Sequence, residues 1–235
     1  MDPTVAITGA TSGIGRAVAE AFVDEGAFVA VSGRDGDAVD RTVAELNGTE
    51  ADESTGVAWG ARADVRDEFD LERFFERVAR EAGPIDIAVA NAAVLHGAPG
   101  ERATDDTAYA EYDDTMRTNA RGVFATIREA TPHLADDARV IVPSGSAARE
   151  SRPGMGAYAV SKAAAEAVAR GFAADLDATV GVVDPGLVAT DLTGKERARA
   201  PESVAPLFVW AATEAPAEDL NGERLGLREW KAATR

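Results

Sequence analysis

A tyrosine and a lysine four residues apart are the clearest candidates for chemistry in this sequence. Tyr158 and Lys162 stand in the run Tyr-Ala-Val-Ser-Lys, which opens an alanine-rich segment that reads as a helix to about residue 176. Residues at i and i+4 share one face of a helix, so the phenol hydroxyl and the ammonium can reach a common point. With three tyrosines and three lysines in the chain, such a pair arises by chance with a probability of about 4%.

This pair suits proton transfer. A tyrosine exchanges a proton near neutral pH only if its pKa falls from about 10. A neighbouring cation favours the phenolate and so lowers that pKa. We therefore predict that Tyr158 is an acid/base and that Lys162 tunes it.

A glycine-rich stretch near the start of the chain is the second candidate. Residues 4–20 read TVAITGATSGIGRAVAE, an apolar run, three glycines and an amphipathic segment, which predicts strand, tight turn and helix. In a nucleotide site Gly9 would let the chain leave the strand sharply, and Gly13 would let the backbone approach a pyrophosphate. Gly15 would let the helix pack closely on the strand, and the N-terminus of that helix would attract phosphate. A glycine-rich turn without a ligand has the same spacing.

With the preceding Thr8, the spacing TGxxxGxG resembles the signature of the classical short-chain dehydrogenase/reductase family. The Tyr-x-x-x-Lys motif and the order of elements from residue 4 to near the C-terminus are similar as well. The resemblance implies one domain over residues 1–235, an α/β fold with a single Rossmann-type doubly wound parallel sheet of about seven strands and helices on both faces.

Apolar runs separated by helical segments also predict a parallel sheet directly. We expect one or two helices between residues 105 and 134, a polar loop at 47–56 and a short substrate lid at about 191–201. Strands are expected at 5–7, 27–32, 57–63, 85–90, 139–143, 179–183 and 222–227, with further helices at 37–46, 68–81 and 202–213.

The resemblance also assigns roles to residues at the ends of these strands. Asn91 keeps one position of the family's NNAG motif, which here reads Asn-Ala-Ala, and Asn119 would interrupt its helix and hold a water that links Lys162 to solvent. Asp64 would contact adenine, although an Asp after a strand is more often a helix cap. The implied cofactor-binding set is Thr8, Gly9, Thr11, Ser12, Gly13, Ile14, Gly15, Arg34, Asp64, Val65, Asn91, Ala92, Tyr158, Lys162, Pro185, Gly186, Val188 and Thr190.

The family also uses a serine to hold the substrate oxygen. The usual separation of thirteen residues before the tyrosine lands on Gly145, between Ser144 and Ser146. A shift of the loop by one residue brings either serine into place, and we favour Ser146 because it lies farther past the strand.

The end of the second strand bears on cofactor choice. An acidic residue there would bond the 2′-hydroxyl of NAD, whereas an arginine suits the 2′-phosphate of NADP. The strand tip is Gly33, followed by Arg34 and Asp35. Arg34 favours NADP(H), Asp35 could compete for the same site, and NAD(H) stays possible. Arg16 could add positive charge nearby.

Composition restricts the partners and the setting. Asp and Glu total 41 against 24 Lys and Arg, a net charge of −17, which argues against nucleic acid and anionic membranes as partners. Few lysines and no cysteine fit a protein of a salt-loaded, halophilic cytoplasm, where salt screens the self-repulsion. We expect a cytoplasmic protein without a signal peptide or membrane span.

No metal site is expected, because His96 stands alone and no cysteine is present. The resemblance implies an NADP(H)-dependent oxidoreductase that moves hydride between nicotinamide and a carbonyl or secondary alcohol, assembled as a homodimer or homotetramer. A dinucleotide-binding sensor without turnover, or a redox-neutral enzyme on the same fold, are the alternatives.

Overall fold

Seven parallel strands form one sheet in the computed structural model, which describes residues 3–48 and 55–234. The sheet order is β3-β2-β1-β4-β5-β6-β7, and every neighbouring pair is parallel. This confirms the predicted fold class. Residues 49–54, within the loop expected at 47–56, lie outside the described part of the chain. The strands are β1 (Thr4–Thr8), β2 (Phe28–Gly33), β3 (Val57–Arg62), β4 (Ile85–Val89), β5 (Leu134–Pro143), β6 (Thr179–Asp184) and β7 (Arg224–Gly226).

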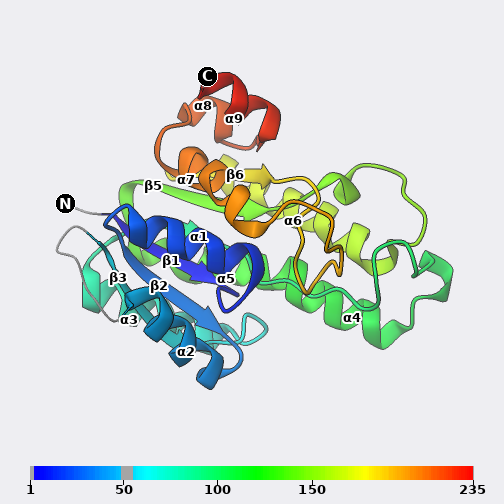
Figure 1. Ribbon diagram of the computed structural model, residues 1–235, viewed down its shortest axis with the longest axis horizontal. Coiled ribbons are helices and arrows are strands. Elements are labelled where there is room, and N and C mark those ends of the chain that lie inside the picture. The colour runs from blue at the N-terminus through cyan, green and yellow to red at the C-terminus, as the bar shows by residue number, and fades with distance from the viewer. Residues whose placement is uncertain (1–2, 49–54, 235) are drawn as a thin grey trace.

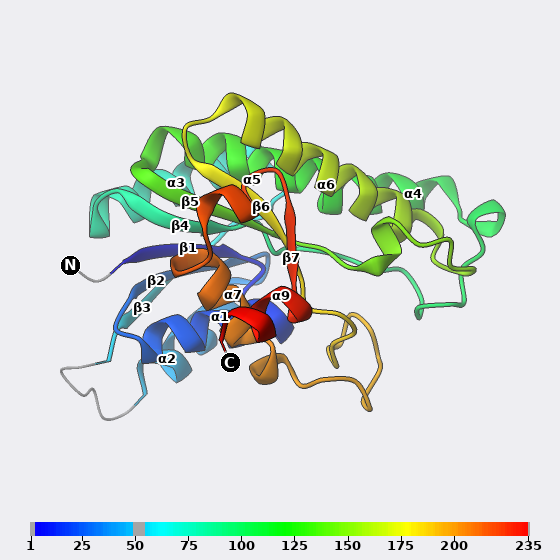
Figure 2. The ribbon, with the colours of Figure 1, turned by 90° about the horizontal axis from the view of Figure 1, so that it is seen from above.

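Helices cover both faces of the sheet, as Figures 1 and 2 show. One face carries α1 (Gly13–Asp24), α2 (Gly36–Asn47) and α7 (Ala205–Thr213). The other carries α3 (Glu68–Ala82), α5 (Gly122–Ala130) and α6 (Gly156–Asp175), and α4 (Tyr109–Met116) packs on α6 beyond the edge of the sheet.

Buried apolar side chains form one cluster on each face. Side chains alternate between the faces along a strand, so Val5 and Ile7 of β1 join the cluster under α1 while Ala6 joins the cluster under α3 and α5. Because both faces are covered, the strands read as continuous apolar runs rather than alternating ones.

The direction of the connections reverses between β1 and β4. The segment after β1 enters α1 on one face, whereas the segment after β4 leads to α4 and α5 on the other. In an open α/β sheet the chain therefore leaves a crevice at the carboxyl ends of these two neighbouring strands.

The one or two helices expected at 105–134 are two, because a π-helical turn (Arg117–Arg121) that contains Asn119 separates α4 from α5. Two predicted strands differ from the structure. The strand expected at 139–143 begins earlier, at Leu134, where Pro132 in a 3₁₀ turn (Thr131–His133) has ended the helical segment. The strand expected at 222–227 is only three residues long. Its last glycine, Gly226, donates its N–H to Glu229 Oε2 at 3.0 Å and thereby starts α9 (Leu227–Ala233), which the sequence analysis did not predict. The short α8 (Ala217–Leu220) was also missed.

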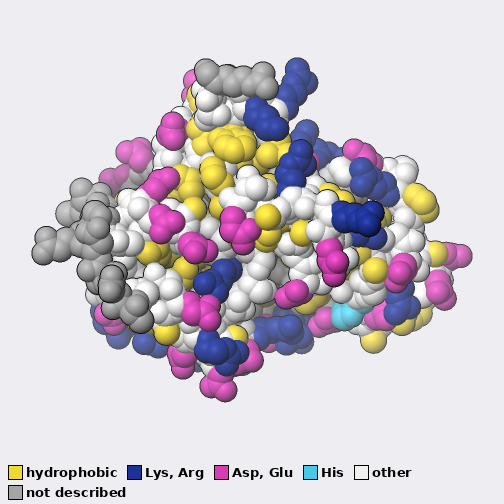
Figure 3. Space-filling view, in the orientation of Figure 1, with side chains coloured by type: hydrophobic (Ala, Val, Ile, Leu, Met, Phe, Trp, Pro, Cys, Tyr) yellow, Lys and Arg dark blue, Asp and Glu magenta, His cyan; other side chains and the backbone are white. Residues whose placement is uncertain are grey.

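Acidic side chains are spread over the face seen in Figure 3, with basic side chains between them. Across residues 3–48 and 55–234, none of the helices is both long and apolar enough to cross a bilayer.

Candidate functional site

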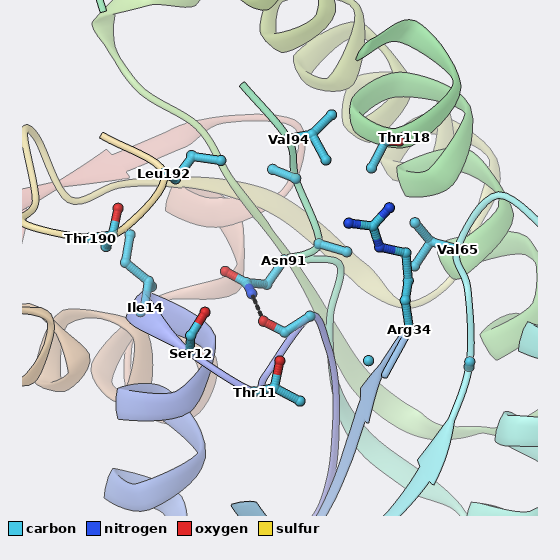
Figure 4. A pocket seen from close by; sticks show the side chains of 16 residues that line it. Thr11, Ser12, Ile14, Arg34, Val65, Asn91, Val94, Thr118, Thr190 and Leu192 are labelled. Atoms are coloured by element: carbon cyan, nitrogen blue, oxygen red, sulfur yellow. Dashed lines mark hydrogen bonds between the residues drawn. The ribbon is translucent and has the colours of Figure 1, made fainter. Parts of the chain in front are cut away.

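A cavity of about 260 Å³ lies at the carboxyl ends of β1 and β4 (Figure 4). Ten of the eighteen predicted cofactor-binding residues line it: Gly9, Thr11, Ser12, Gly13, Ile14, Arg34, Val65, Asn91, Ala92 and Thr190. The cavity therefore occupies the crevice that the sheet topology creates, and the glycine-rich turn forms one of its walls.

Each glycine of the turn is required by its surroundings. Gly9 (φ +64°) passes so close to the segment after β4 that a Cβ would lie 2.6 Å from the Cα of Ala92. Gly13 (φ +56°) faces Thr190, whose Cγ2 would lie 3.1 Å from an added Cβ. A Cβ on Gly15 would meet the side-chain nitrogen of Asn91 at 2.3 Å, so α1 approaches the sheet as closely as only glycine permits.

The N-terminus of α1 opens into this cavity. Ser12 is the N-cap residue, but its hydroxyl accepts no N–H from the first turn within the described residues, and that turn contains no acidic side chain. Ser12, Gly13 and Ile14 all line the cavity. The first N–H groups of a helix lack intrahelical partners and attract anions, so this wall suits a phosphate.

Asn91 joins the ends of β1 and β4. Its side-chain nitrogen donates to the carbonyl oxygens of Thr8 (3.1 Å) and Gly9 (2.7 Å), the latter bond lying in the view of Figure 4. In return, Thr8 Oγ1 accepts the backbone N–H of Asn91 at 3.2 Å. Thr8 is buried, and it therefore supports the cavity wall from behind rather than lining it.

Arg34 lines the opposite end of the cavity and forms no ion pair with the described residues. Its neighbour Asp35 is the N-cap of α2, where Oδ1 accepts the N–H of Ala38 at 3.2 Å. Arg16 pairs with Glu45 of α2 instead of facing the cavity. The charge at this end of the cavity is therefore the Arg34 guanidinium.

Of the predicted adenine contacts, Val65 lines the cavity and Asp64 does not. Burial alone would raise the pKa of Asp64, but hydrogen bonds from Arg66, at 2.6 Å to Oδ2 and 3.0 Å to Oδ1, hold it below its usual range. Asp64 thus orders the segment that follows β3.

Tyr158 and Lys162 lie on the first turns of α6, next to the end of β5. The Lys162 Nζ is 5.8 Å from the centre of the Tyr158 ring and donates to the carbonyl oxygen of Pro143 at 2.9 Å. Burial raises the pKa of Tyr158 to about 12. Burial also lowers the pKa of Lys162 to about 8, although the negative charge of Glu166 acts in the opposite direction and raises it. In this state of the protein the phenol is therefore firmly protonated.

Tyr158 faces a second, much smaller cavity, which Leu95 and His96 also line. Their neighbour Val94 lines the large cavity, so the loop after β4 separates the two spaces by a single residue. His96 Nε2 lies 3.0 Å from Asp114 Oδ2 of α4, which fixes this loop beside Tyr158.

The two candidate serines differ in their partners. Ser144 is buried and its hydroxyl donates to Glu166 Oε1 at 2.7 Å. Ser146 is half-buried at the start of a 3₁₀ turn (Ser146–Ala148), and its hydroxyl has no hydrogen-bond partner among the described residues.

Asn119 lies in the π-helical turn, where it is fully buried. Its amide clamps the backbone of Val94, accepting the N–H at 2.7 Å and donating to the carbonyl oxygen at 2.8 Å. It also donates to Ser161 Oγ at 3.0 Å, and that hydroxyl donates to the carbonyl oxygen of Tyr158 at 2.8 Å. Asn119 therefore connects the loop after β4 to the first turn of α6.

The lid folds back on the segment after β6. Ala189 donates its N–H to the carbonyl oxygen of Arg199 at 2.7 Å, and Thr193 Oγ1 donates to the carbonyl oxygen of Val188 at 2.6 Å. These bonds place Thr190 and Leu192 at the cavity. Pro185, Gly186 and Val188 lie along the same segment but do not line the cavity.

Six further residues line the cavity but were not predicted: Gly33, Ala63, Ala93, Val94, Thr118 and Leu192. Each is next to, or two residues from, a predicted one, so extending each motif by two residues would have found them. Thr118 also carries a buried Oγ1 without a hydrogen-bond partner in the described part of the chain.

Comparisons with known proteins agree with this geometry. A family model described as short chain dehydrogenase matches residues 3–201. The chain is 34% identical over 187 residues to an uncharacterized oxidoreductase, YvrD, of Bacillus subtilis, covering 77% of this chain and 67% of the relative. It is 32% identical over 191 residues to 2,3-dihydro-2,3-dihydroxybenzoate dehydrogenase of the same organism, covering 79% and 70%. A short chain dehydrogenase from Burkholderia cenocepacia J2315, solved in complex with NADP, superposes with a TM-score of 0.82 at 26% identity and covers 96% of each chain.

Replacing Gly15 with Ala should damage both stability and the cavity. The new Cβ would overlap Asn91 Nδ2 and the carbonyl oxygen of Gly9, and such overpacking costs about 1–3 kcal/mol. We expect a lower free energy of unfolding and dinucleotide binding weakened by about tenfold or more. Chemical denaturation and fluorescence titration measure the two effects.

The matched control is Gly171→Ala on α6, where an added Cβ meets nothing within 4 Å. This variant should gain about 0.5–1 kcal/mol, because alanine is the better helix former, and bind dinucleotide normally. Equal binding by both variants would contradict the account of Gly15.

The high pKa of Tyr158 predicts that this tyrosine does not ionise when the folded protein is titrated to moderately alkaline pH. Burial favours the neutral phenol, so Tyr158 should stay protonated until the pH approaches 12. The tyrosinate absorbance of folded wild-type protein and of Tyr158→Phe should therefore coincide between about pH 9 and about pH 11. A deficit of one ionised tyrosine in the variant over that range would show that the phenol is not shielded.

Proposed function

Because the chain belongs to the short-chain dehydrogenase family and is an oxidoreductase, we propose that it uses NADP(H) to interconvert a carbonyl compound and a secondary alcohol. The observation that carries the proposal is the position of Tyr158 and Lys162 beside a cavity walled by the glycine-rich turn. One short loop, residues 91–96, joins the two features, because Val94 lines the large cavity and the next residue, Leu95, lines the small cavity at Tyr158.

The residues of the cavity fit a dinucleotide. Gly9 and Gly13 line the cavity with backbone alone, so a phosphate can approach the turn closely, and the uncapped N-terminus of α1 suits a pyrophosphate. The ribose would lie against Asn91, the adenine against Val65 and the phosphate against Thr190. Arg34 would pair with a 2′-phosphate. The dinucleotide supplies or accepts the hydride.

The chain's own groups handle the proton and the substrate oxygen. Tyr158 Oη would donate a proton to the oxygen atom during reduction and take it back during oxidation. Lys162, held on Pro143, would supply the positive charge that the phenolate needs in a buried position. Ser146, whose hydroxyl is uncommitted, would hold the substrate oxygen.

Asn119 would support the catalytic groups by holding the loop 91–96 at Val94. Its side chain is occupied by Val94 and Ser161, so a water that links Lys162 to solvent would have to bond to its backbone. We include Asn119 in the proposed catalytic set for this reason.

The proposed setting follows from the charge and from the resemblance. A net charge of −17 fits work in a salt-rich cytoplasm, and neither nucleic acid nor membrane is a proposed partner. The proposed assembly is a homodimer or homotetramer.

Arg34→Gln tests the choice of cofactor. Losing the charged hydrogen bonds to a 2′-phosphate should weaken NADPH binding about 10- to 100-fold and change NADH binding little. Fluorescence titration with both dinucleotides, in low and in molar KCl, measures this. Because salt screens charges, the loss should be larger at low salt.

Arg41→Gln is the matched control, since Arg41 is an exposed arginine on α2 outside the cavity and its loss changes the net charge equally. It should leave both titrations unchanged. Wild-type protein that binds NADH as tightly as NADPH would overturn the proposed preference.

The proposed chemistry predicts distinct effects for three hydroxyl groups. Tyr158→Phe should lower kcat by about 10²–10⁴ while dinucleotide binding persists, because only the proton donor is lost. Ser146→Ala should lower kcat by about 10²–10³. Steady-state rates from a screen of carbonyl substrates with NADPH measure both.

Ser144→Ala is the comparison for Ser146→Ala, since the two serines flank Gly145. A greater loss of kcat in Ser144→Ala would assign the substrate contact to Ser144. Turnover that survives in Tyr158→Phe would disprove the mechanism.

A further inference from the structure

A buried carboxylate, Glu166, lies one helical turn beyond Lys162 on α6 and is only 6% exposed. Nothing in the proposed reaction uses it. Carboxylates are almost never buried without a partner, so its surroundings call for an explanation.

Glu166 and Lys162 contact two consecutive residues at the end of β5. Lys162 Nζ donates to the carbonyl oxygen of Pro143 at 2.9 Å, and Ser144 Oγ donates to Glu166 Oε1 at 2.7 Å. Lys162 and Glu166 stand at i and i+4, on one face of α6, and their partners Pro143 and Ser144 are adjacent in the chain. The ammonium and the carboxylate therefore both face the end of β5, although they form no direct ion pair within 4 Å among the described residues.

We propose that Glu166 is a positioning residue for the catalytic pair: its carboxylate takes the hydrogen bond of the Ser144 hydroxyl and keeps the neighbouring Lys162 ammonium charged. The role of Glu166 in catalysis rests on the proposed function, whereas its electrostatic effect on Lys162 does not depend on that function. The effect on Lys162 follows because burial disfavours an ammonium whereas an adjacent anion favours it.

The effect on Ser144 follows from its single hydroxyl proton. That proton is committed to a carboxylate, and charge-assisted hydrogen bonds of this kind are stronger than neutral ones. While Ser144 donates to Glu166 it cannot also donate to a substrate oxygen, which leaves Ser146 for that role.

The other charges around Glu166 are arranged in a chain. Arg149 Nε lies 3.6 Å from Glu166 Oε1, and the same guanidinium pairs with Asp184 of β6 at 2.9 Å. Arg224 of β7 lies 3.3 Å from Asp184. The positive charge of Arg149 therefore offsets part of the negative charge of Glu166 and weakens its stabilisation of the Lys162 ammonium.

Charged groups on the other elements packed against α6 are engaged elsewhere. Asp114 of α4 pairs with Arg66 and His96, and Arg121 of the π-helical turn pairs with Glu68 of α3. Tyr158 is the remaining titratable group beside Lys162, and it stays neutral over the range tested here because burial raises its pKa.

The chain offers a direct measurement, since it contains only three lysines. Protein labelled with carbon-13 at the lysine ε-carbon should give three NMR signals, and Lys162→Arg identifies the signal of Lys162. Its titration yields the Lys162 pKa in the intact protein without substrate or dinucleotide.

Glu166→Gln should lower that pKa by about 1, because the variant keeps the size of the side chain and removes its charge. Arg149→Gln should raise it, because the competing cation is lost. Glu150→Gln, an exposed carboxylate of the same loop paired with Arg152, is the matched control and should change nothing. Glu166→Asp keeps the charge and should stay nearer to wild type than Glu166→Gln.

An unchanged Lys162 pKa in Glu166→Gln, or a fall in Arg149→Gln, would overturn the proposal. If Glu166→Gln does not fold, the upward shift in Arg149→Gln decides alone. In the active enzyme, the alkaline limb of kcat against pH should move to lower pH in Glu166→Gln. Absence of turnover in wild type would refute the proposed function while the NMR titration still tests Glu166.

Discussion

The hydrogen bonds between Asn91 and the end of β1 are the interaction on which the site depends. Two neighbouring strands send their chains to opposite faces of the sheet, and their ends would separate if nothing tied them together. The Asn91 amide holds the carbonyl oxygens of Thr8 and Gly9 across this divide. Gly15 then lets α1 approach the same amide, so one side chain fixes both the strand ends and the helix that follows them.

A second amide, that of Asn119, holds the same loop on the side of Tyr158. It pairs with the backbone of Val94 as a neighbouring strand would, three residues beyond Asn91. The loop 91–96 is thereby held by asparagine side chains at Asn91 and at Val94, and by Asp114 at His96. One end borders the large cavity and the other borders Tyr158, so the distance between the two spaces is set by backbone rather than by mobile side chains.

The sequence predicted most of the sheet because strands buried on both faces are continuous apolar runs. It predicted the large cavity because the glycine-rich turn stands between the first strand and the first helix, together with the other motifs of the resembled family. It could not separate Ser144 from Ser146, since their difference depends on Glu166, which is 22 residues beyond Ser144 and belongs to no motif. It also missed α9, because Leu227 extends an apolar strand as readily as it begins a helix. The partner of Gly226, the Glu229 carboxylate, decides between the two.

Burial of Tyr158 and Lys162 also affects stability, with opposite signs at different pH. Lys162 has a folded pKa of about 8 against an ordinary 10.5, so its burial cost is full below pH 8 and diminishes as the pH rises from there to 10.5. Tyr158 has a raised pKa, so its contribution is complete below pH 10.0 and is lost between there and about 12. Together these two groups favour the folded state most near pH 10, where most of the Lys162 cost is gone and the Tyr158 contribution is still nearly complete.

The closeness of Thr11 to Gly33 restricts how the proposed dinucleotide site can be re-engineered or can diverge. An acidic side chain at position 33 is the usual way to select a 2′-hydroxyl, yet a Cβ there would lie 2.8 Å from Thr11 Cγ2. The neighbouring Asp35 cannot substitute for it without giving up the start of α2. An acidic residue at position 33 would therefore need Thr11 to shift or to be replaced by a smaller residue, so positions 11 and 33 of the proposed dinucleotide site can change only together.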